Sequence, residues 1–428
     1  MHVYFAGIGA GTGPLALIAK QAGFDVSGSD KQSSSYTEYL YKKAGITIAI
    51  GQTGEELAEA HRKQPIDWLV YSSALPKENP QHPELLKAKE LGIKATKRDE
   101  FLNELLEQTG QKLIAIAGTH GKSTTTAMMI WLLKELGLSL SYSVGAKLPF
   151  GEMGEFNPAA EYFVYEADEY DRNFLSFTPY MGVITGVSYD HQDVYPTQED
   201  YTAAFVQFIH SCQVSVAWDE DGLDAKPQKL VLLHENDVAP QLKLIGLVNR
   251  QNAWQVIRAV QQLSDYDELR LVEIMNRFPG LSRRFERLAE NIYTDYAHTM
   301  EKIRGALQTA HEVAGDNIVV VYEGLHNTRQ HFMLERGQFD GLFANIRELI
   351  WVPSYLARED PKLELLSPAQ LIERTGVTGK AAVLDESLWA DITQAAKNGS
   401  LVLLISAGGG GSLDEWARQH VKTAEDRH

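Results

Sequence analysis

Short apolar runs alternate along the chain with longer stretches of mixed polarity. Short apolar runs are typical of strands buried on both faces, and the longer stretches between them are typical of helices. This alternation predicts an α/β fold, with parallel sheets covered by helices on both faces. Strands are predicted at residues 2–6, 25–30, 68–72, 112–117, 162–166, 182–185, 292–295, 317–322, 348–352 and 401–406, and a helix at 14–22.

The length of the chain indicates more than one domain. Its 428 residues exceed what one hydrophobic core usually supports, so two to three domains are expected. A polar helix end at residues 104–110 and a new strand after residues 287–291 favour three. We predict a Rossmann-like N-terminal domain at 1–108, a central P-loop ATPase-type domain with a parallel sheet at 109–288, and a C-terminal Rossmann-like α/β domain at 289–428.

Composition and charge exclude several classes of protein. A hydrophobic content of 44% and a charged content of 23% are those of a soluble globular protein, and no apolar run approaches membrane-spanning length. A net charge of −17 argues against nucleic acid or an anionic membrane as a partner. The single cysteine, Cys212, excludes an internal disulfide framework and is predicted to be a buried small hydrophobe. Because the first strand begins at once, we expect no signal peptide and predict a cytoplasmic protein.

The segment after the apolar strand at 112–117 has the composition of a phosphate-binding loop. It reads Gly118-Thr119-His120-Gly121-Lys122-Ser123-Thr124. The N–H groups of such a turn and of the following helix point at an anion, a lysine adds a full charge, and a hydroxyl can reach Mg2+. The alternative, a strand-turn-helix junction that only needs its glycines, requires neither Lys122 nor Ser123. We therefore predict that this segment binds phosphate groups.

Two further segments with cation-binding side chains also follow apolar strands. Glu166-Ala167-Asp168-Glu169 lies at the end of one strand, and Asp190-His191 follows the next. Mg2+ prefers carboxylate oxygens and commonly keeps water and phosphate oxygens as its other ligands. A solvated acidic loop is the alternative for the first segment alone, but three separate strand ends with such groups favour a metal site. We predict Ser123, Glu166 and His191 as its ligands.

The N-terminal strand leads into a glycine-rich turn, and the next strand ends on an acid. In dinucleotide-binding folds such glycines admit a pyrophosphate, and the acid meets a sugar hydroxyl or a base. Gly7, Gly9 and Gly11 are the glycines concerned, and Asp30 is the acid. Thr12 breaks the G-x-G-x-x-G spacing, which argues against an NAD-dependent dehydrogenase.

With these segments together, the chain resembles the Mur ligase family, the ATP-dependent amide-forming ligases of peptidoglycan synthesis, over nearly its whole length. The resemblance implies Mg2+ as cofactor and ATP as co-substrate. It implies roles for residues whose type alone does not reveal them. The implied ATP-binding residues are Gly118, Thr119, His120, Gly121, Lys122, Ser123, Thr124, Asn249, Asn252, Arg283 and Asp295. The implied UDP-sugar-binding residues are Gly7, Gly9, Gly11, Ser29, Asp30, Ser73, Asn79 and Arg98, and the implied catalytic residues are Lys122, Glu166, His191 and Arg284.

Within the family, the motifs are most similar to those of the branch that joins L-alanine to UDP-N-acetylmuramate through an acyl phosphate. The implied partners are the small molecules UDP-N-acetylmuramate, L-alanine and ATP, bound by a monomer or homodimer. His298, His326 and Arg329 are the implied amino-acid-binding residues. Phe205 stands where the branches that add later residues place a carbamylated lysine. That position favours the alanine-adding branch or the branch that recycles a murein tripeptide.

Two alternatives to the alanine-adding ligase stay open. Asn327 and Thr328 resemble the tripeptide-recycling branch, whereas the segment at 355–359 resembles the alanine-adding one. The other alternative is a nucleotide-binding regulator derived from a ligase that has lost turnover. It is disfavoured because the phosphate-loop and metal-binding residues are all present.

Overall fold

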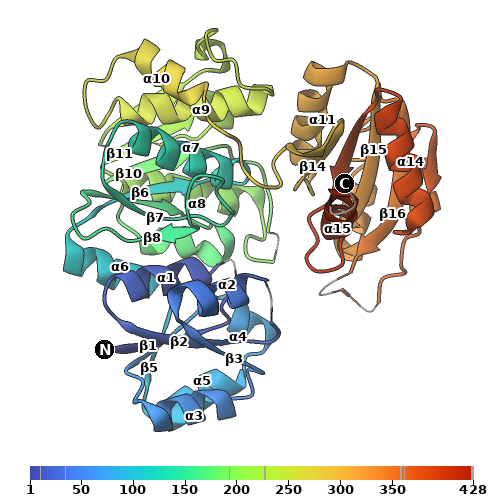
Figure 1. The fold of residues 1–428 in the computed structure, drawn as a ribbon. Coiled ribbons are helices and arrows are strands. Elements are labelled where there is room, and N and C mark those ends of the chain that lie inside the picture. Colours follow the sequence, from blue (N-terminus) through green and yellow to red (C-terminus); the bar gives the residue numbers. More distant parts are fainter. Residues whose placement is uncertain are drawn as a thin grey trace. The chain divides into compact units, whose positions relative to one another are not determined.

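The computed structural model describes residues 1–9, 11–33, 35–191, 193–225, 228–356, 359–360 and 362–425. These residues form three β-sheets flanked by helices (Figure 1). The chain divides into two compact units, Met1–Leu242 with Gln251–Pro279 and Lys243–Arg250 with Gly280–His428. The first unit holds two sheets and the second unit holds the third. The predicted α/β class is therefore confirmed.

The N-terminal sheet is entirely parallel, with the strand order β3-β2-β1-β4-β5. Its strands are β1 (His2–Ala6), β2 (Asp25–Asp30), β3 (Thr47–Ile50), β4 (Trp68–Tyr71) and β5 (Lys94–Lys97), and its helices are α1 (Gly13–Gln21), α2 (Ser35–Ala44), α3 (Glu55–Lys63), α4 (Ala74–Glu78), α5 (Pro83–Glu90) and α6 (Arg98–Thr109). Successive side chains of a strand point to opposite faces. Val3 and Phe5 accordingly join a core with α1, α2 and α6, and Tyr4 and Ala6 join one with α3 and α5.

The second sheet has the order β12-β11-β10-β6-β9-β7-β8, and only the β7/β8 pair is antiparallel. Its strands are β6 (Lys112–Ala117), β7 (Leu140–Ser143), β8 (Gly154–Glu155), β9 (Tyr162–Glu166), β10 (Met181–Ile184), β11 (Val214–Trp218) and β12 (Leu230–Leu233). The helices around it are α7 (Lys122–Glu135), η1 (Tyr170–Ser176), α8 (Gln198–Ser211), η2 (Asp219–Asp221), η3 (Glu235–Asp237), α9 (Leu247–Val260) and α10 (Glu268–Met275).

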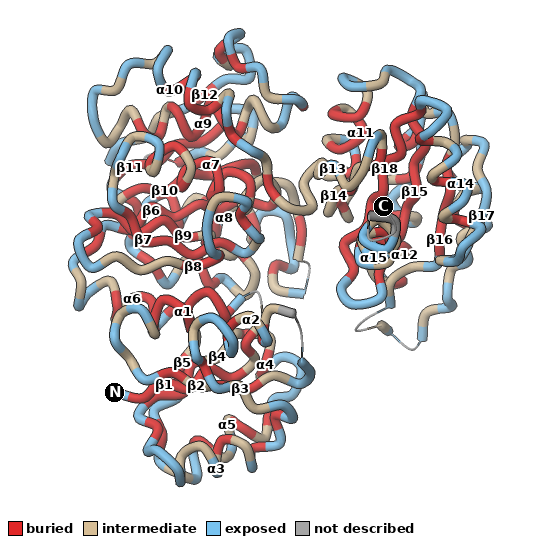
Figure 2. The backbone as a smooth tube through the Cα atoms, in the orientation of Figure 1, coloured by how far each residue is buried: buried red, intermediate tan, exposed pale blue. Residues whose placement is uncertain are grey.

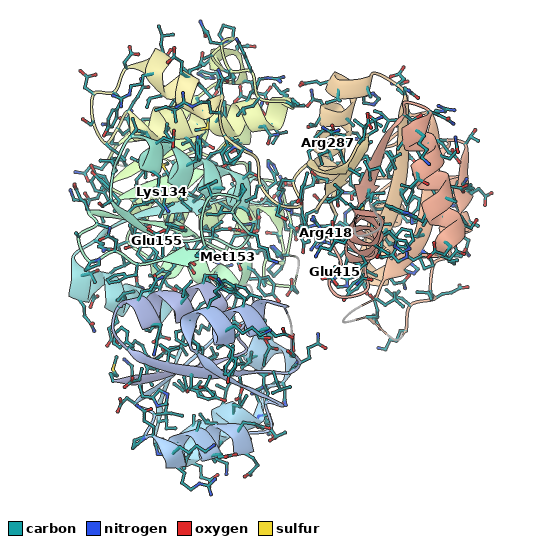
Figure 3. The ribbon with its side chains drawn as sticks, viewed as in Figure 1. Lys134, Met153, Glu155, Arg287, Glu415 and Arg418 are labelled. Carbon is teal, nitrogen blue, oxygen red and sulfur yellow. The ribbon has the colours of Figure 1, made fainter. Side chains whose placement is uncertain are left out.

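The short edge strand β8 is fixed to helix α7 by side chains. The Lys134 ammonium lies 2.7 Å from a carboxylate oxygen of Glu155, and both residues are labelled in Figure 3. The hydroxyl of Tyr142 on β7 donates to the same oxygen at 3.0 Å. A short edge strand held by charged groups offers little backbone for pairing with another chain.

One hydrophobic core joins the first two sheets. It contains side chains of β1, α1 and α6 from the N-terminal sheet and of β9, η1 and α8 from the second sheet. Figure 2 shows these strands as buried segments and the outer faces of the helices as exposed. Because the core is continuous, the N-terminal sheet and the central sheet are packed as one unit.

The third sheet has the order β13-β14-β18-β15-β16-β17, with an antiparallel hairpin between β13 and β14. Its strands are β13 (Glu286–Ala289), β14 (Ile292–Asp295), β15 (Ile318–Leu325), β16 (Glu348–Tyr355), β17 (Gly379–Ala381) and β18 (Leu401–Ile405). One face packs on α11 (Met300–Ala314), α12 (Asn327–Glu335) and α13 (Pro368–Thr375), and the other on α14 (Glu386–Lys397) and α15 (Leu413–Glu425).

Several helices begin at side-chain caps that the sequence supplies. Thr197, Thr299 and Asp385 each accept a hydrogen bond from the backbone N–H three residues later, at the starts of α8, α11 and α14. Ser367 and Gln370 form a reciprocal capping box at the start of α13. Such caps satisfy N–H groups that a helix leaves without an internal partner.

All ten predicted strands are present, with ends that differ by at most three residues from the prediction. The helix predicted at 14–22 is α1. The sheets are not purely parallel, because two of them carry an antiparallel hairpin that a run of apolar residues does not reveal. The predicted domain boundaries stay predictions. The one at 288/289 falls inside β13, so the sheet pairing favours a boundary before Gly280, where the second unit resumes.

Two further findings concern membrane-spanning helices and the single cysteine. Within the part of the chain that the structure describes, no helix combines the length and apolar character needed to cross a membrane. Cys212 is a buried free thiol whose Sγ lies 3.2 Å from the carbonyl oxygen of Phe208. Burial raises the pKa of this thiol to about 12, which makes it a poor nucleophile at neutral pH.

Phe174 provides a test of the shared core. Its ring is fully buried, with centroids 5.1 Å from Phe205 and 5.0 Å from Phe208. Removing a buried aromatic ring leaves a cavity, so Phe174→Ala should destabilise the protein by about 3 to 5 kcal/mol. We expect a clearly lower midpoint of thermal unfolding by circular dichroism. Leu269→Ala, at a 59% exposed position, should leave the midpoint nearly unchanged.

Candidate active site

Three of the predicted motifs follow three neighbouring strands of the second sheet. Strand β6 lies between β9 and β10 and pairs with both in parallel. The phosphate-type loop follows β6, the acidic segment follows β9, and the segment that ends in Asp190-His191 follows β10. Carboxyl ends of parallel strands meet at one edge of a sheet, which is where open α/β sheets bind ligands. The arrangement therefore gathers all three motifs at this edge.

The phosphate-type loop is fixed by the segment after β10. Gly118 has a φ of +145°, and a Cβ atom there would lie 2.3 Å from the Oγ1 atom of Thr185. The Thr119 N–H donates to the carbonyl oxygen of Gly186 at 2.8 Å, and the Thr119 hydroxyl lies 2.7 Å from that of Tyr201. Helix α7 begins directly after the loop at Lys122. A helix N-terminus beneath a tight loop is a site for an anion.

Two side chains predicted to bind ATP lie at this loop, His120 within it and Asn252 beside it. Gly186 has a φ of +149°, and a Cβ atom there would lie 2.2 Å from the ring of His120, so glycine leaves room for the imidazole. Asn252 on α9 is buried, with its Oδ1 atom 3.1 Å from where a Cβ of Gly121 would be. Asn249 is one turn earlier on α9 and belongs to the second unit, where its amide donates to the carbonyl oxygen of Ile245 at 2.8 Å.

The Lys122 ammonium has two strong partners. It donates to the carbonyl oxygen of Gly118 and to the Oε2 atom of Glu169, each at 2.6 Å. Burial disfavours its charge, but the nearby carboxylates, chiefly Glu169, outweigh burial and raise the pKa of Lys122. For Glu169, burial acts against ionisation, yet Lys122 and His191 lower its pKa to about 2. Both groups are therefore charged at neutral pH.

The structure brings two of the three predicted metal ligands into contact. The Ser123 hydroxyl donates to the Oε1 atom of Glu166 at 2.8 Å, and the Gly145 N–H donates to its Oε2 atom at 2.9 Å. His191 instead contacts Glu169, with 3.2 Å between Nε2 and Oε1. Among the described residues, no group of three or more His, Cys, Asp or Glu side chains is arranged to hold a metal ion. A hydroxyl and a carboxylate still suit Mg2+, which takes water and phosphate oxygens as further ligands.

His191 adopts an unusual backbone conformation. Its φ is +58°, in the left-handed region that non-glycine residues rarely enter, and its N–H donates to the Oδ1 atom of Asp190 at 2.8 Å. Strained backbone of this kind clusters at functional sites. Burial opposes its positive charge, but the hydrogen bond and charge of Glu169 and the charges of Asp190 and Asp168 raise the pKa of His191.

Sequence reasoning missed Glu169. It named the residue within the acidic segment but chose Glu166 as the metal ligand of that segment and gave Glu169 no role. The side chain of Glu169 is only 2% exposed, whereas that of Asp168, next to it in the chain, is 37% exposed. Nothing in the sequence of two adjacent acids separates the buried one from the exposed one.

Arg98 connects the N-terminal glycine turn to the acidic segment. Its guanidinium donates to the carbonyl oxygen of Gly11 and to Asp168, each at 3.1 Å. A Cβ atom at Gly11 would lie 2.7 Å from this guanidinium. Arg98 was predicted to bind the UDP-sugar, and here it lies between the two segments. Its Nε atom is buried with no hydrogen-bond partner within the described residues.

The N-terminal glycine turn is held by backbone hydrogen bonds to the end of β2. The N–H groups of Gly7 and Ile8 both donate to the carbonyl oxygen of Ser29, at 3.0 and 2.9 Å, and the Gly9 N–H donates to the carbonyl oxygen of Gly7.

The remaining predicted UDP-sugar residues make hydrogen bonds of their own. Ser73 accepts a hydrogen bond from the amide of Asn173 at 2.9 Å. Asp30 accepts one from the Lys31 N–H at 2.7 Å, and burial raises its pKa. Asn79 ends α4 and accepts from the Gln81 N–H at 3.0 Å, so its contact is local.

In the second unit, Arg283 and Arg284 both lie close to the ring of Tyr296. The guanidinium carbons of Arg283 and Arg284 lie 4.5 and 4.9 Å from the ring centroid of Tyr296. Arg283 has a φ of +59° and donates to the carbonyl oxygens of Ser406 and Gly408 at 3.2 and 3.0 Å. Asp295 accepts from the Phe285 N–H at 2.8 Å. The three predicted ATP or catalytic residues of this region are therefore close together.

Positive charges surround His298, one of the predicted amino-acid-binding residues. Burial, followed by the positive charges of Lys302, Arg329 and Arg284, holds the pKa of His298 well below its usual value. His326, with a φ of +57°, occupies the N-cap position of α12, and its Nδ1 atom lies 3.6 Å from the Oε1 atom of Glu359. In the segment at 355–359, Ala357 and Arg358 lie outside the described residues. The charges gathered around His298 suit an anionic ligand.

Comparison with known proteins identifies the family. Residues 2–109 match the profile of the Mur ligase family, catalytic domain, and residues 116–230 match that of the Mur ligase middle domain. The UDP-N-acetylmuramate–L-alanine ligases of Paenarthrobacter aurescens and Carboxydothermus hydrogenoformans are 32% and 31% identical, with 95% of this chain and 94% of each relative covered. The chain therefore belongs to the Mur ligase family.

Solved structures with the same fold include two ligases. The UDP-N-acetylmuramate-alanine ligase MurC of Thermotoga maritima has a TM-score of 0.79 at 24% identity, with both chains fully covered. A murein peptide ligase of Psychrobacter arcticus has a TM-score of 0.67 at 22% identity and covers 99% of this chain and 98% of its own. These likenesses confirm the fold.

Asp295 gives the second unit a pH-dependent stability. Burial raises its pKa to about 6, although Arg284 and Arg283 act in the opposite direction. A carboxyl whose pKa is raised on folding contributes most stability below its unfolded pKa of about 4 and loses it as the pH rises through 6. The stability of the wild-type protein relative to Asp295→Asn should therefore fall by about 2 to 3 kcal/mol between pH 4 and pH 7.

The asparagine variant is a suitable reference because its side-chain oxygen can still accept from Phe285 and does not titrate. Unfolding curves of both proteins at each pH provide the measurement, since all other titrating groups cancel in the difference. A difference that is constant over this range would show that Asp295 keeps an ordinary pKa.

Proposed function

We propose that this protein is an ATP-dependent ligase that joins L-alanine to the lactyl carboxylate of UDP-N-acetylmuramate. The observation that carries the proposal is the convergence of Lys122, Ser123 and Glu166 at one sheet edge, in a chain whose relatives over 95% of its length are named as ligases of this kind. Such a ligase supplies a peptidoglycan precursor. Its nucleotide substrates place the reaction in the cytoplasm, where the protein acts as a monomer or homodimer.

The chemistry needs positioned cations rather than a protein nucleophile. The lactyl carboxylate attacks the γ-phosphorus of ATP, the bond to the β,γ-bridging oxygen breaks, and ADP leaves. The amine nitrogen of L-alanine then attacks the carbonyl carbon of the acyl phosphate, loses a proton, and inorganic phosphate leaves with the C–O electron pair. Substrates and transition states are anionic, so stabilisation comes from positioning and positive charge.

We assign the ATP phosphates to the segment at 118–124, which consists of the loop after β6 and the first turn of α7. Lys122 supplies a charge for the β- and γ-phosphates. Arg283 and Asp295 are the residues of the second unit that we expect to bind ATP, and we expect Arg284 to take part in catalysis. Ser123, Glu166 and His191 would hold Mg2+, which supplies charge neutralisation of the phosphates. Asn249 and Asn252 would border the adenine.

We assign the UDP-sugar to the N-terminal glycine turn. Gly7, Gly9 and Gly11 would admit the diphosphate, with Ser29, Asp30, Ser73 and Asn79 as further contacts. Arg98, which touches both this turn and Asp168, would lie beside the bound sugar nucleotide and the phosphate site.

Phe205 argues against the branches that add later residues and leaves the alanine-adding and the tripeptide-recycling ligase. This side chain is fully buried in α8 against Phe174 and Tyr201, so the position has neither room nor a nitrogen for a carbamate. Asn327 favours the tripeptide-recycling ligase instead, by its resemblance to that branch. His298, His326 and Arg329 would bind the incoming amino acid.

An assay of ADP release with UDP-N-acetylmuramate and each candidate amine tests the proposal. L-alanine should be the preferred amine, with weak turnover of glycine and serine, because one methyl group gives only about 1 to 3 kcal/mol of discrimination. Lys122→Ala should lower kcat about a thousandfold with the fold intact. Lys89→Ala, at an exposed lysine on α5, should have no effect. Faster ligation of L-Ala-γ-D-Glu-meso-diaminopimelate than of L-alanine would replace this proposal with the recycling ligase.

Arg329 should determine the affinity for the amino acid. An arginine holds a carboxylate with two parallel hydrogen bonds, whereas a lysine keeps only the charge. Arg329→Lys should therefore raise the KM for L-alanine by about tenfold, with much smaller changes for ATP and UDP-N-acetylmuramate. Arg336→Lys is the matched control, because Arg336 follows the same helix and stacks on Phe332. Equal changes in all three KM values would remove Arg329 from the amino-acid site.

A further inference from the structure

Glu169 is a buried carboxylate to which the proposed reaction assigns no task. One oxygen lies 2.6 Å from the Lys122 ammonium and the other lies 3.2 Å from the Nε2 atom of His191. Its backbone is also fixed, because the Tyr195 hydroxyl donates to the Glu169 carbonyl oxygen at 2.6 Å. A single carboxylate thus joins the lysine of the phosphate loop to the histidine of the neighbouring strand end.

The other acids of the same segment have different partners. Glu166 accepts from Ser123 and from the Gly145 N–H. Asp168 accepts from the Arg98 guanidinium and from the Tyr170 N–H. Each acid therefore has its own set of donors, and Glu169 is the one in direct contact with Lys122.

We propose that Glu169 is a positioning residue that competes with nucleotide phosphates for Lys122 and holds the ring of His191. The inference rests on the proposed function, because that function makes Lys122 the phosphate-binding charge. The ammonium has three N–H groups, and Gly118 and Glu169 accept from two of them. A phosphate that accepts from more than the third must therefore replace Glu169 or the Gly118 carbonyl, and it competes with the charge of Glu169 in either case. The carboxylate that loses Lys122 retains His191 as a donor, so it does not become a buried charge without a partner.

The contact with His191 has a chemical consequence. An imidazole that donates from Nε2 has only the Nδ1 lone pair left to offer to a cation. Glu169 would therefore set both the tautomer and the orientation of His191, even when a phosphate has displaced Glu169 from Lys122. Loss of the carboxylate should tighten phosphate binding and at the same time slow turnover, two effects that a purely structural residue would not combine.

Glu169→Gln separates these effects, because it keeps the size of the side chain and removes its charge. We expect the Kd for ADP, measured by calorimetry on the full chain in the presence of EDTA, to fall by about threefold to tenfold, since a competing arrangement of Lys122 is removed. The Kd for adenosine, which has no phosphate, should not change. In the ligase assay, KM for ATP should fall and kcat should fall by about tenfold or more.

Asp171→Asn is the matched control for the loss of one negative charge. Asp171 lies two residues further along and pairs with Lys97 at 2.7 Å and Lys77 at 3.2 Å, not with Lys122. Its φ of +56° suits asparagine as well as aspartate. Its effect on the Kd for ADP should stay within about twofold. In a Lys122→Met background, Glu169→Gln should no longer tighten ADP binding, which a double-mutant cycle measures directly.

Glu169→Asp provides a second variant, because it keeps the charge but is too short to reach both partners. It should also tighten ADP binding, by less than the glutamine. Unchanged or weaker ADP binding in Glu169→Gln, or a gain that persists without Lys122, would overturn the proposal. Failure of both variants to fold would also count against it, because it would give Glu169 a structural task. If the wild-type protein binds ADP but ligates no amine, the proposed function fails while the competition for Lys122 is still measured.

Discussion

The parallel pairing of β6 with both β9 and β10 is the constraint on which the rest of the structure depends. Parallel strands end at the same edge of a sheet, so the three loops that follow them must meet there. Each loop has a different chemical character: one presents a helix N-terminus and a lysine, one presents carboxylates, and one presents a histidine. No long loop is needed to assemble them, because the sheet itself fixes their separation.

Charge compensation within this edge follows from the same geometry. The protein carries a net charge of −17, yet the proposed ligands are anions, so positive charge must be supplied locally. Lys122 is held between the Gly118 carbonyl and Glu169, and Arg98 between the Gly11 carbonyl and Asp168. A buried cation without an acceptor would be destabilising, and these two carboxylates keep the cations charged and oriented. In our proposal, the anionic partner of Lys122 is also the group with which a bound phosphate competes.

The core shared by the first two sheets gives the N-terminal glycine turn a fixed place beside the acidic segment. Side chains of β1 and α6 pack in the same cluster as those of β9 and α8. Polar contacts such as Asn173 with Ser73 reinforce this packing. Three of the proposed site residues, His191, Arg283 and His326, have positive φ values that surrounding contacts must hold.

The sequence by itself determined the class of fold, the positions of ten of the strands and the place of the loop that we propose binds phosphate. Short apolar runs and glycine-bracketed turns are local signals, because they report how a segment meets its immediate neighbours. Only the tertiary structure decided which strands are adjacent and which acid of the segment is buried. It also decided that β13 pairs antiparallel with β14 and β8 with β7. Glu169 and Asp168 are adjacent in the chain and alike in chemistry. Their difference comes from Lys122, His191 and Arg98, which approach from other parts of the chain, and no local pattern carries that information.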